Sequence, residues 1–382
     1  MSFFQKLTFF LGVLTIPYLL GMSGLFFGHS PPILNGAGGS FPYPLYSKWY
    51  FEYTKIDPSV RFNYQPIGSG GGIHQLLSHT IDFAGSDSPI PDSLITGSSR
   101  EVIHIPTVAG AVVIAYNVAN VPLLNLNKET LSGIFLGEIT RWNDPRIVFL
   151  NPQATLPDLP IVVIHRSDGS GTTYIFTEYL SKISQRWAIL AGKGTSVRWQ
   201  IGIGAKGNAG VAAAIKTING SIGYIELAYA LQNGFPMAAI QNQIGQYVAP
   251  SMESVTKAFP RSFDHKDFRI SLTDSAEEGA YPIAGLTWIL LNINSTPPLR
   301  LECLIKFLSW ALTDGQTYVL PMDYAPLPSS LRQNVLHLLE EVRRKNSLSA
   351  FPWSQRRSCW LLVGKECKIS CPNLAIFKNK NN

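Results

Sequence analysis

The chain has few cysteines, and none of them lies in its first 300 residues. All four, Cys303, Cys359, Cys367 and Cys371, fall in the last quarter of a sequence of 382 residues. The spacing of Cys367 and Cys371 allows a metal site, but no histidine lies near them, and a disulfide formed in an oxidising compartment is the alternative. The body of the protein therefore relies neither on disulfides nor on thiolate ligands.

Patterns that mark an enzyme are also missing. The histidines show no metal-ligand spacing, and His74 and His79 do not share one helical face. Gly169-Ser-Gly171 lacks the spacing of a nucleophile elbow, and no lysine completes a phosphate-binding loop after Gly68-Ser-Gly-Gly-Gly72. The aspartate and histidine clusters of a metal-dependent phosphatase are not seen. We therefore expect no catalytic residue, no metal and no cofactor.

Charged residues make up only 15% of the chain, and their signs are unevenly distributed. The formal net charge is +6, but from Arg343 onward nine lysines and arginines stand against Glu366 alone. Subtracting these from the totals of 31 basic and 25 acidic residues leaves 22 and 24. Because the body has no excess of positive charge, we expect no nucleic-acid partner, and any selectivity for anions must be local.

The longest apolar run stands near the N-terminus, from Leu7 to Phe27 after Lys6. Such a segment is typical of an export signal, so residues 1–30 are interpreted as a signal peptide with Gly21-Met-Ser23 as the best cleavage site. The run is also long enough to span a bilayer, which leaves an uncleaved anchor as the alternative. With no cysteine nearby, lipid attachment is not expected.

The chain is rich in predicted strands that are followed by glycine- or serine-rich turns. Ile33–Pro42 combines a strand, such a turn and the start of a helix pattern. In the next unit a strand, Arg61–Gln65, and a glycine turn, Pro66–Gly72, precede a helix expected from Ile73 to Ser78. Thr80–Asp87 is a strand that ends in a polar turn. Strands alternating with helices predict an α/β fold with mostly parallel sheets. Ligands of such sheets bind at the carboxyl ends of the strands, where these turns lie.

Two long apolar strands, 105–116 and 282–292, interrupt the alternation. We interpret them as a paired crossover between lobe I, residues 31–110 with 287–342, and lobe II, residues 111–286. A strand pair between two lobes forms a hinge that can close over a ligand. The alternative is that both strands belong to a single large sheet.

The segment Val163–Phe176 is typical of an anion site. A strand delivers Arg166 and Asp168, and the turn Ser170-Gly-Thr172 then opens a helix whose free N–H groups and dipole attract negative charge. Arg166 adds a planar fork suited to an oxyanion. Asp168 either orients that fork or is a turn residue. The plain alternative for the whole segment is an ordinary capped helix after a strand.

Three further residues are candidates for the same site. Ser40 and Ser69 are either hydroxyl donors to the anion or helix N-caps. Asp87 can accept a hydrogen bond from phosphate, which carries a proton near neutral pH, but not from sulfate; the alternative is a turn residue before Pro89. The loop 202–210 also precedes a helix, but we interpret it as structural.

Taken together, the sequence from Ile33 to Leu339 resembles the periplasmic phosphate-binding proteins of bacterial phosphate ABC transporters. Seven matching motifs in the same order make the resemblance specific. They are Gly36-Ala-Gly-Gly-Ser-Phe-Pro42, Tyr64-Gln-Pro-Ile-Gly-Ser-Gly-Gly-Gly72, Asp82-Phe-Ala-Gly-Ser-Asp87, Leu136-Gly-Glu-Ile-Thr-Arg-Trp-Asn-Asp144, Arg166-Ser-Asp-Gly-Ser-Gly-Thr172, Gly204–Gly210 and Gly220-Ser-Ile-Gly-Tyr224.

The resemblance implies a type II periplasmic-binding-protein fold, with two mostly parallel sheets flanked by helices and joined by a two-strand hinge. It implies a periplasmic protein, expected to be a monomer, that binds inorganic phosphate between its lobes and delivers it to the membrane permease of an ABC transporter. A sensor or surface-retained binding protein is one alternative, and a phosphatase on the same scaffold is another. The implied phosphate contacts are Ser40, Phe41 (through its N–H), Ser69, Asp87, Arg166, Ser170, Gly171 and Thr172, with Asp168 orienting Arg166.

The chain departs from the family pattern at three places. Ser40 stands where the family commonly has threonine, and Gly70 replaces a serine often seen in the glycine turn. The basic, cysteine-containing tail 343–382 extends beyond the usual end of the family. We interpret the tail either as a solvated or membrane-surface segment or as the product of an altered reading frame.

Overall fold

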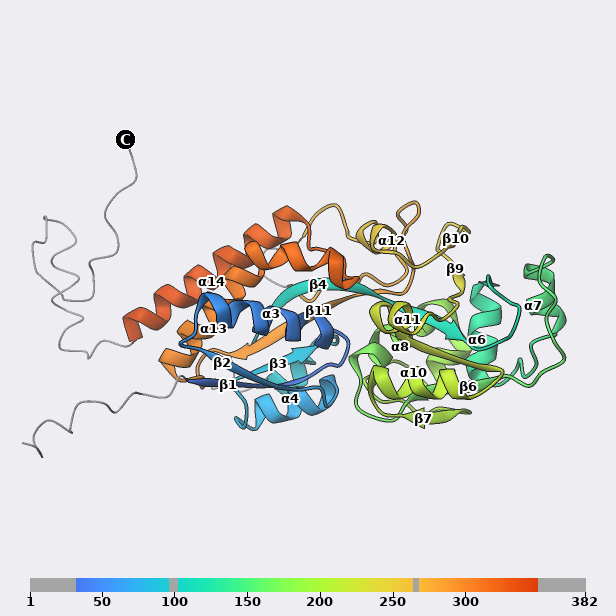
Figure 1. Cartoon of the computed structure of the whole chain (residues 1–382), viewed down its shortest axis with the longest axis horizontal. Coiled ribbons are helices and arrows are strands. Elements are labelled where there is room, and N and C mark those ends of the chain that lie inside the picture. Colours follow the sequence, from blue (N-terminus) through green and yellow to red (C-terminus); the bar gives the residue numbers. More distant parts are fainter. Residues whose placement is uncertain (1–31, 96–101, 264–267, 350–382) are drawn as a thin grey trace, which may run out of the picture.

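The computed structural model describes residues 32–95, 102–263 and 268–349 (Figure 1). The predicted export segment 1–30 and the cysteines Cys359, Cys367 and Cys371 lie outside the described residues. Within the described ranges, no helix combines the length and the apolar character that crossing a bilayer requires.

The described strands form one large mixed sheet and one small sheet. The large sheet has eight strands in the order β2-β1-β3-β11-β4-β8-β6-β7, and the small one has the order β10-β9-β5. The strands are β1 Ile33–Gly38, β2 Arg61–Gln65, β3 Phe83–Ser86, β4 Val102–Tyr116, β5 Asn125–Leu126, β6 Val162–Arg166, β7 Ile203–Ala205, β8 Ser221–Glu226, β9 Ala239–Gln241, β10 Tyr247–Val248 and β11 Ala284–Asn292.

Each half of the large sheet is parallel, and two antiparallel strands join the halves. β1 pairs in parallel with β2 and β3, and β6 pairs in parallel with β7 and β8. β4 is 15 residues long, so it pairs with β11 from Val102 to Ala111 and with β8 from Val112 to Tyr116. The two long strands therefore pair as expected, and the length of β4 links both halves into one strand order.

Helices cover both halves, which form the two ends of the elongated molecule (Figure 1). α3, α4, α13 and α14 accompany the first half, and α6, α8, α10 and α11 the second. The helices are α3 Tyr43–Ile56, α4 Ser69–Leu77, α5 Asp92–Ile95, α6 Lys128–Leu136, α7 Pro145–Leu150, α8 Gly171–Ile183, α9 Gln185–Leu190, α10 Gly207–Thr217, α11 Leu227–Asn233, α12 Met252–Thr256, α13 Pro298–Ala311 and α14 Ser329–Ser349, with 3₁₀ turns at Asp314–Tyr318 and Leu320–Met322.

The expected helix starting at Ile73 begins four residues earlier, so the glycine run is helical rather than a turn. Gly68 at the N-cap has φ +91°, a conformation that only glycine adopts without strain. Inside the helix, a Cβ at Gly72 would lie 2.6 Å from the carbonyl oxygen of Ala37. The glycines therefore let α4 pack directly on β1, which brings Ser69 close to the end of that strand.

Two other boundaries also differ from expectation. The apolar run Leu159–Ile164 predicts a strand, but β6 continues to Arg166. The glycine-rich loop 202–210 predicts a helix from Val211, but α10 begins within that loop, at Gly207. At the other end of the chain, α14 continues through the predicted lobe boundary at 342 to Ser349. Arg343 on α14 donates from Nε to Oε1 of Glu302 on α13 at 3.0 Å.

Candidate functional site

The polar residues predicted for the site gather at the carboxyl ends of strands and at helix starts, and their side chains are buried except that of Asp168, which is half-buried. Ser40 follows β1, Asp87 follows β3, and Arg166 ends β6. The starts of α4, α8 and α10 lie beside Asp87, Arg166 and Ser40, respectively. Hydrogen bonds such as those of Ser40 with Asn208 and Tyr229 link the two halves of the molecule here. Elements far apart in the sequence therefore build one site.

Arg166 is held by Asp168 in a two-pronged ion pair. Its Nε lies 2.8 Å from Oδ1 of Asp168, and its Nη2 lies 2.5 Å from Oδ2. The N–H of Gly207 also donates to Oδ1 at 3.0 Å. Burial by itself would raise the pKa of Asp168, but the hydrogen bonds and charge of Arg166 and the Gly207 N–H bring that pKa below its usual value.

A third N–H of Arg166 points to the start of α8, where Nη1 donates to Oγ1 of Thr172 at 3.2 Å. Since a guanidinium carries five N–H groups, two remain for a ligand. Asp168 is thus an orienting partner of Arg166 in this structure rather than a turn residue alone.

Asp87 and Ser69 lie against each other. Oγ of Ser69 accepts from the N–H of Asp87 at 3.1 Å and lies 3.4 Å from Oδ2 of its carboxyl group. Oδ1 of Asp87 is buried and accepts no hydrogen bond from the described residues. The nearby hydroxyl of Thr287 donates instead to the carbonyl of Ser86, at 3.3 Å. The turn interpretation alone does not account for a carboxyl group buried in this way.

Burial raises the pKa of Asp87 to about 7, against the lowering influences of Thr287, Arg166 and Ser69. The carboxyl group therefore changes its charge near neutral pH. Such a group, buried with a free acceptor atom in a site rich in donors, is typical of functional positions.

The alternative that a serine only caps a helix holds for Ser170 but not for Ser40 or Ser69. Ser170 caps α8, because its Oγ accepts from the N–H of Thr173 at 3.1 Å. Ser40 and Ser69 are not caps: Pro42 and Gly68 occupy the N-cap positions of α3 and α4. The cap interpretation is therefore wrong for Ser40 and Ser69.

Gly171 lies in close contact with residues of the other half. A Cβ at this position would lie 2.5 Å from both Oδ2 of Asp87 and Oγ of Ser69, too close for any side chain. The start of α8 therefore reaches Asp87 only because residue 171 is glycine.

Phe41, predicted to bind the anion through its backbone N–H, has its ring in the core. The ring is buried against that of Tyr324, with 6.3 Å between centroids, and Tyr324 donates its hydroxyl to the Phe41 carbonyl at 2.6 Å. The same hydroxyl lies 3.4 Å from Oε2 of the buried Glu226. Burial raises the pKa of Glu226 well above its usual value.

Sequence reasoning missed Asn208, which lies at the start of α10. Its Nδ2 donates to Oγ of Ser40 at 3.1 Å and to Oγ1 of Thr172 at 3.3 Å. The loop 202–210 was interpreted as structural, although it repeats the strand, glycine turn and helix order of the other site segments. That repetition is the signal that points to Asn208.

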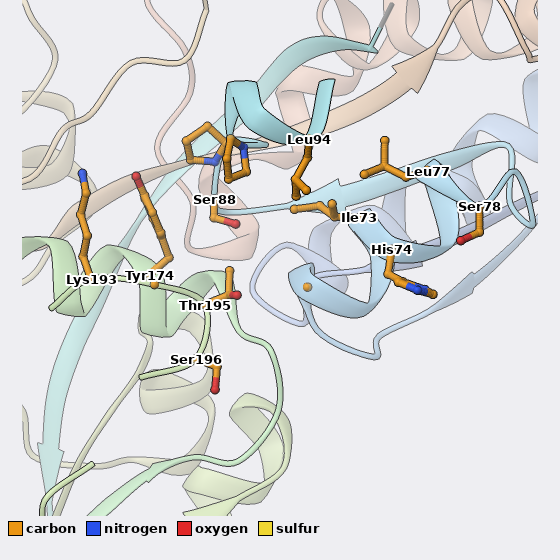
Figure 2. A pocket seen from close by; sticks show the side chains of 14 residues that line it. Ile73, His74, Leu77, Ser78, Ser88, Leu94, Tyr174, Lys193, Thr195 and Ser196 are labelled. Atoms are coloured by element: carbon orange, nitrogen blue, oxygen red, sulfur yellow. The ribbon is translucent and has the colours of Figure 1, made fainter. Parts of the chain in front are cut away.

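A cavity of about 810 Å³ opens beside these residues, between the two halves (Figure 2). Ile73 and Ser88, the latter next to Asp87 in the sequence, lie on one side, and Tyr174 and Thr195 lie on the other. Gly70, the neighbour of Ser69, also lines the cavity. No group of histidine, cysteine, aspartate or glutamate side chains within the described residues is arranged to hold a metal ion.

Comparison with known proteins places this geometry in context. Residues 27–314 match the family described as a PBP superfamily domain. The phosphate-binding protein PstS of Haemophilus influenzae is 42% identical over 318 residues, which cover 82% of this chain and 94% of that protein.

Two solved structures share the fold. A high-affinity periplasmic phosphate-binding protein bound with phosphate has a TM-score of 0.62 and 20% identity, over 80% of this chain and 93% of that one. The phosphate-binding protein from Stenotrophomonas maltophilia has a TM-score of 0.61 and 21% identity over the same shares. The predicted α/β fold with two lobes is therefore confirmed.

Proposed function

This chain belongs to the PBP superfamily, in the family of the phosphate-binding proteins PstS, and on that premise we propose that it binds inorganic phosphate between its two lobes and delivers it to the permease of an ABC transporter. The 42% identical PstS protein and the solved structure with bound phosphate support this proposal.

One observation in the site carries the proposal for the ligand. A buried carboxyl group with a free acceptor atom, Oδ1 of Asp87, lies in a site that otherwise presents donors. A ligand that fits must accept several hydrogen bonds and also donate one. Phosphate near neutral pH does both, since it keeps a proton, whereas sulfate has none to donate.

The remaining contacts are assigned from their positions. Arg166 offers its two free N–H groups, and Ser40, Ser69, Ser170 and Thr172 offer hydroxyl groups. The backbone N–H groups of Phe41 and of the α8 start at Gly171 complete the donors. Because Asp168 already neutralises the charge of Arg166, most of the recognition comes from neutral dipoles.

We propose that one lobe comprises residues 31–110 with 287–342 and the other residues 111–286, with β4 and β11 as the hinge. Three contacts near the site join the lobes: Oγ of Ser40 with Asn208, the Gly70 N–H with the Gly169 carbonyl at 2.9 Å, and the Tyr229 hydroxyl with the Ser40 carbonyl at 2.8 Å. Contacts of this kind form when the lobes close over a ligand.

The protein is proposed to act in the periplasm as a monomer and without catalysis, since its relatives are named as binding proteins. Titration with labelled phosphate should give one bound phosphate per chain, with no turnover of a chromogenic phosphate ester. Steady ester hydrolysis would instead favour a phosphatase. Mass spectrometry of the exported chain tests whether the segment 1–30 is cleaved, and light scattering tests the monomer.

A further inference from the structure

The amide of Asn208 has only one orientation that fits its surroundings. Asn208 is fully buried, and its Oδ1 accepts from the backbone N–H of Glu226 at 3.1 Å. Because a backbone N–H can only donate, the oxygen must face Glu226 and the NH₂ group must face the opposite way. That group points to Ser40 and Thr172.

Ser40 receives two donors from this one residue. Its Oγ lies 3.2 Å from the backbone nitrogen of Asn208 and 3.1 Å from Nδ2. A hydroxyl oxygen has two lone pairs, so both are used. The O–H of Ser40 is then restricted to donating, and among the described residues it has no acceptor.

Thr172 is in the same situation. Its Oγ1 lies 3.2 Å from Nη1 of Arg166 and 3.3 Å from Nδ2 of Asn208, and both of these groups can only donate. The O–H of Thr172 must also donate to a third partner. The hydroxyl groups of Ser40 and Thr172, from opposite lobes, can thus only donate a further hydrogen bond. Asn208 donates to both of them.

We propose that Asn208 is a positioning residue that makes Ser40 and Thr172 obligate donors to the bound anion. The inference rests on the proposed function and deepens it by explaining the ligand's orientation. Asn208 thus fixes two donors of the site, and Oδ1 of Asp87 is a buried acceptor that no described residue uses. The protonated oxygen of phosphate must therefore face Asp87. Because Ser40 and Asn208 belong to different lobes, the Ser40 hydroxyl becomes restricted to donating only when the lobes close.

The test is a double-mutant cycle with phosphate affinity as the readout. Asn208→Asp keeps the shape and still accepts from Glu226, but its second oxygen accepts from Ser40 and Thr172 and turns their hydroxyl protons away from the ligand. We expect Ser40→Ala to weaken phosphate binding about tenfold in the otherwise unchanged protein, the value of one good hydrogen bond. In the Asn208→Asp background the same change should cost less than about threefold.

The cycle compares Ser40→Ala in both backgrounds, so the charge added by Asn208→Asp cancels. Asn208→Ala serves as a second background if the aspartate variant does not fold, and urea unfolding without ligand checks the stability of each protein. Asn151→Ala is the matched control, because Asn151 is buried and bonded to the backbone of Asn125 and Ile147. In that background Ser40→Ala should keep its full effect.

The outcomes separate this inference from the proposed function. Equal effects of Ser40→Ala with and without Asn208 would overturn the positioning role while leaving phosphate binding intact. Failure of the unchanged protein to bind phosphate would contradict the proposed function itself, and the inference with it.

Discussion

At the scale of single residues, the site contains two acids with different roles, the half-buried Asp168 and the buried Asp87. Asp168 is bonded to Arg166 through both oxygens, which keeps it ionised and removes the net charge of the pair. Asp87 has no such partner, and burial raises its pKa to about 7. The first acid shapes the donor side of the site, and the second is available to the proton of the ligand.

Asp87→Asn should relax the discrimination between phosphate and sulfate. The amide can donate to an unprotonated oxygen, whereas the ionised carboxylate can only accept. Sites built on a required hydrogen bond reject analogues by roughly 10⁴-fold, and we expect the variant to narrow this ratio at least tenfold. Competition of each anion for the site measures the ratio. An unchanged ratio would refute the role assigned to Asp87.

Sulfate binding should depend on pH in a defined direction. Below about pH 7 the Asp87 carboxyl group of the closed site holds a proton and can donate it to sulfate; above that pH it is ionised and repels sulfate. Sulfate affinity should therefore fall by up to about tenfold per unit as pH rises above 7, because one proton is linked to binding. Calorimetry across this range, with Asp87→Asn as the variant that lacks the dependence, provides the check. A flat profile for the unchanged protein would contradict the argument.

At the scale of elements, glycines determine how closely helix starts approach the strands. α4 packs on β1 because Gly72 has no side chain, and α8 reaches Asp87 because Gly171 has none. Both helices thereby aim their N-terminal N–H groups at the same place.

Gly171→Ala should abolish tight phosphate binding without unfolding the protein. Alanine stabilises a helix over glycine by about 0.5–1 kcal/mol, but its Cβ would lie 2.5 Å from Asp87 and Ser69 and would hold the lobes apart. Gly210→Ala in α10 is the control, since its nearest neighbour would lie 3.6 Å away. We expect an affinity loss of at least about 100-fold for the first and less than about twofold for the second, with urea unfolding as the stability measurement. Equal affinities for the two variants would show that the close approach is not required.

A site residue could be predicted from the sequence when its role follows from its immediate neighbours in the chain, and not when it depends on a residue far away in the sequence. Ser69, Asp87 and Arg166 each end or follow a strand in a local pattern, so the alternation of strands and turns identified them. Asn208 acts on Ser40 across 168 positions, and Tyr324 acts on Phe41 across 283. No local pattern records such contacts. The start of α4 was misplaced for a related reason: glycine favours turns locally, but here packing on β1 requires it inside a helix.

At the scale of the whole molecule, the long strand β4 passes from one lobe to the other while β11 pairs beside it. Few chain segments cross between the lobes, and bending at such a place lets them move as rigid bodies. Ser40, Gly70 and Gly171 contact the opposite half of the molecule, as expected if the lobes are closed.

Phosphate should therefore make the protein more compact. Without ligand the buried Asp87 carboxyl group and the hydroxyl donors of the closed site have no partner, which favours an open form. We expect small-angle scattering to show a smaller radius of gyration when phosphate is added, and no change with sulfate at alkaline pH. Gly171→Ala should remain in the open form with both anions. Identical scattering of the unchanged protein with and without phosphate would argue against closure.

The most direct measurement of the central claim is calorimetric titration of the purified chain with phosphate and, separately, with sulfate, at about pH 8, where Asp87 is largely ionised. The account predicts tight binding of one phosphate per chain and no detectable heat of binding for sulfate. Equal binding of both anions would contradict proton recognition by Asp87, and absence of phosphate binding would contradict the proposed function.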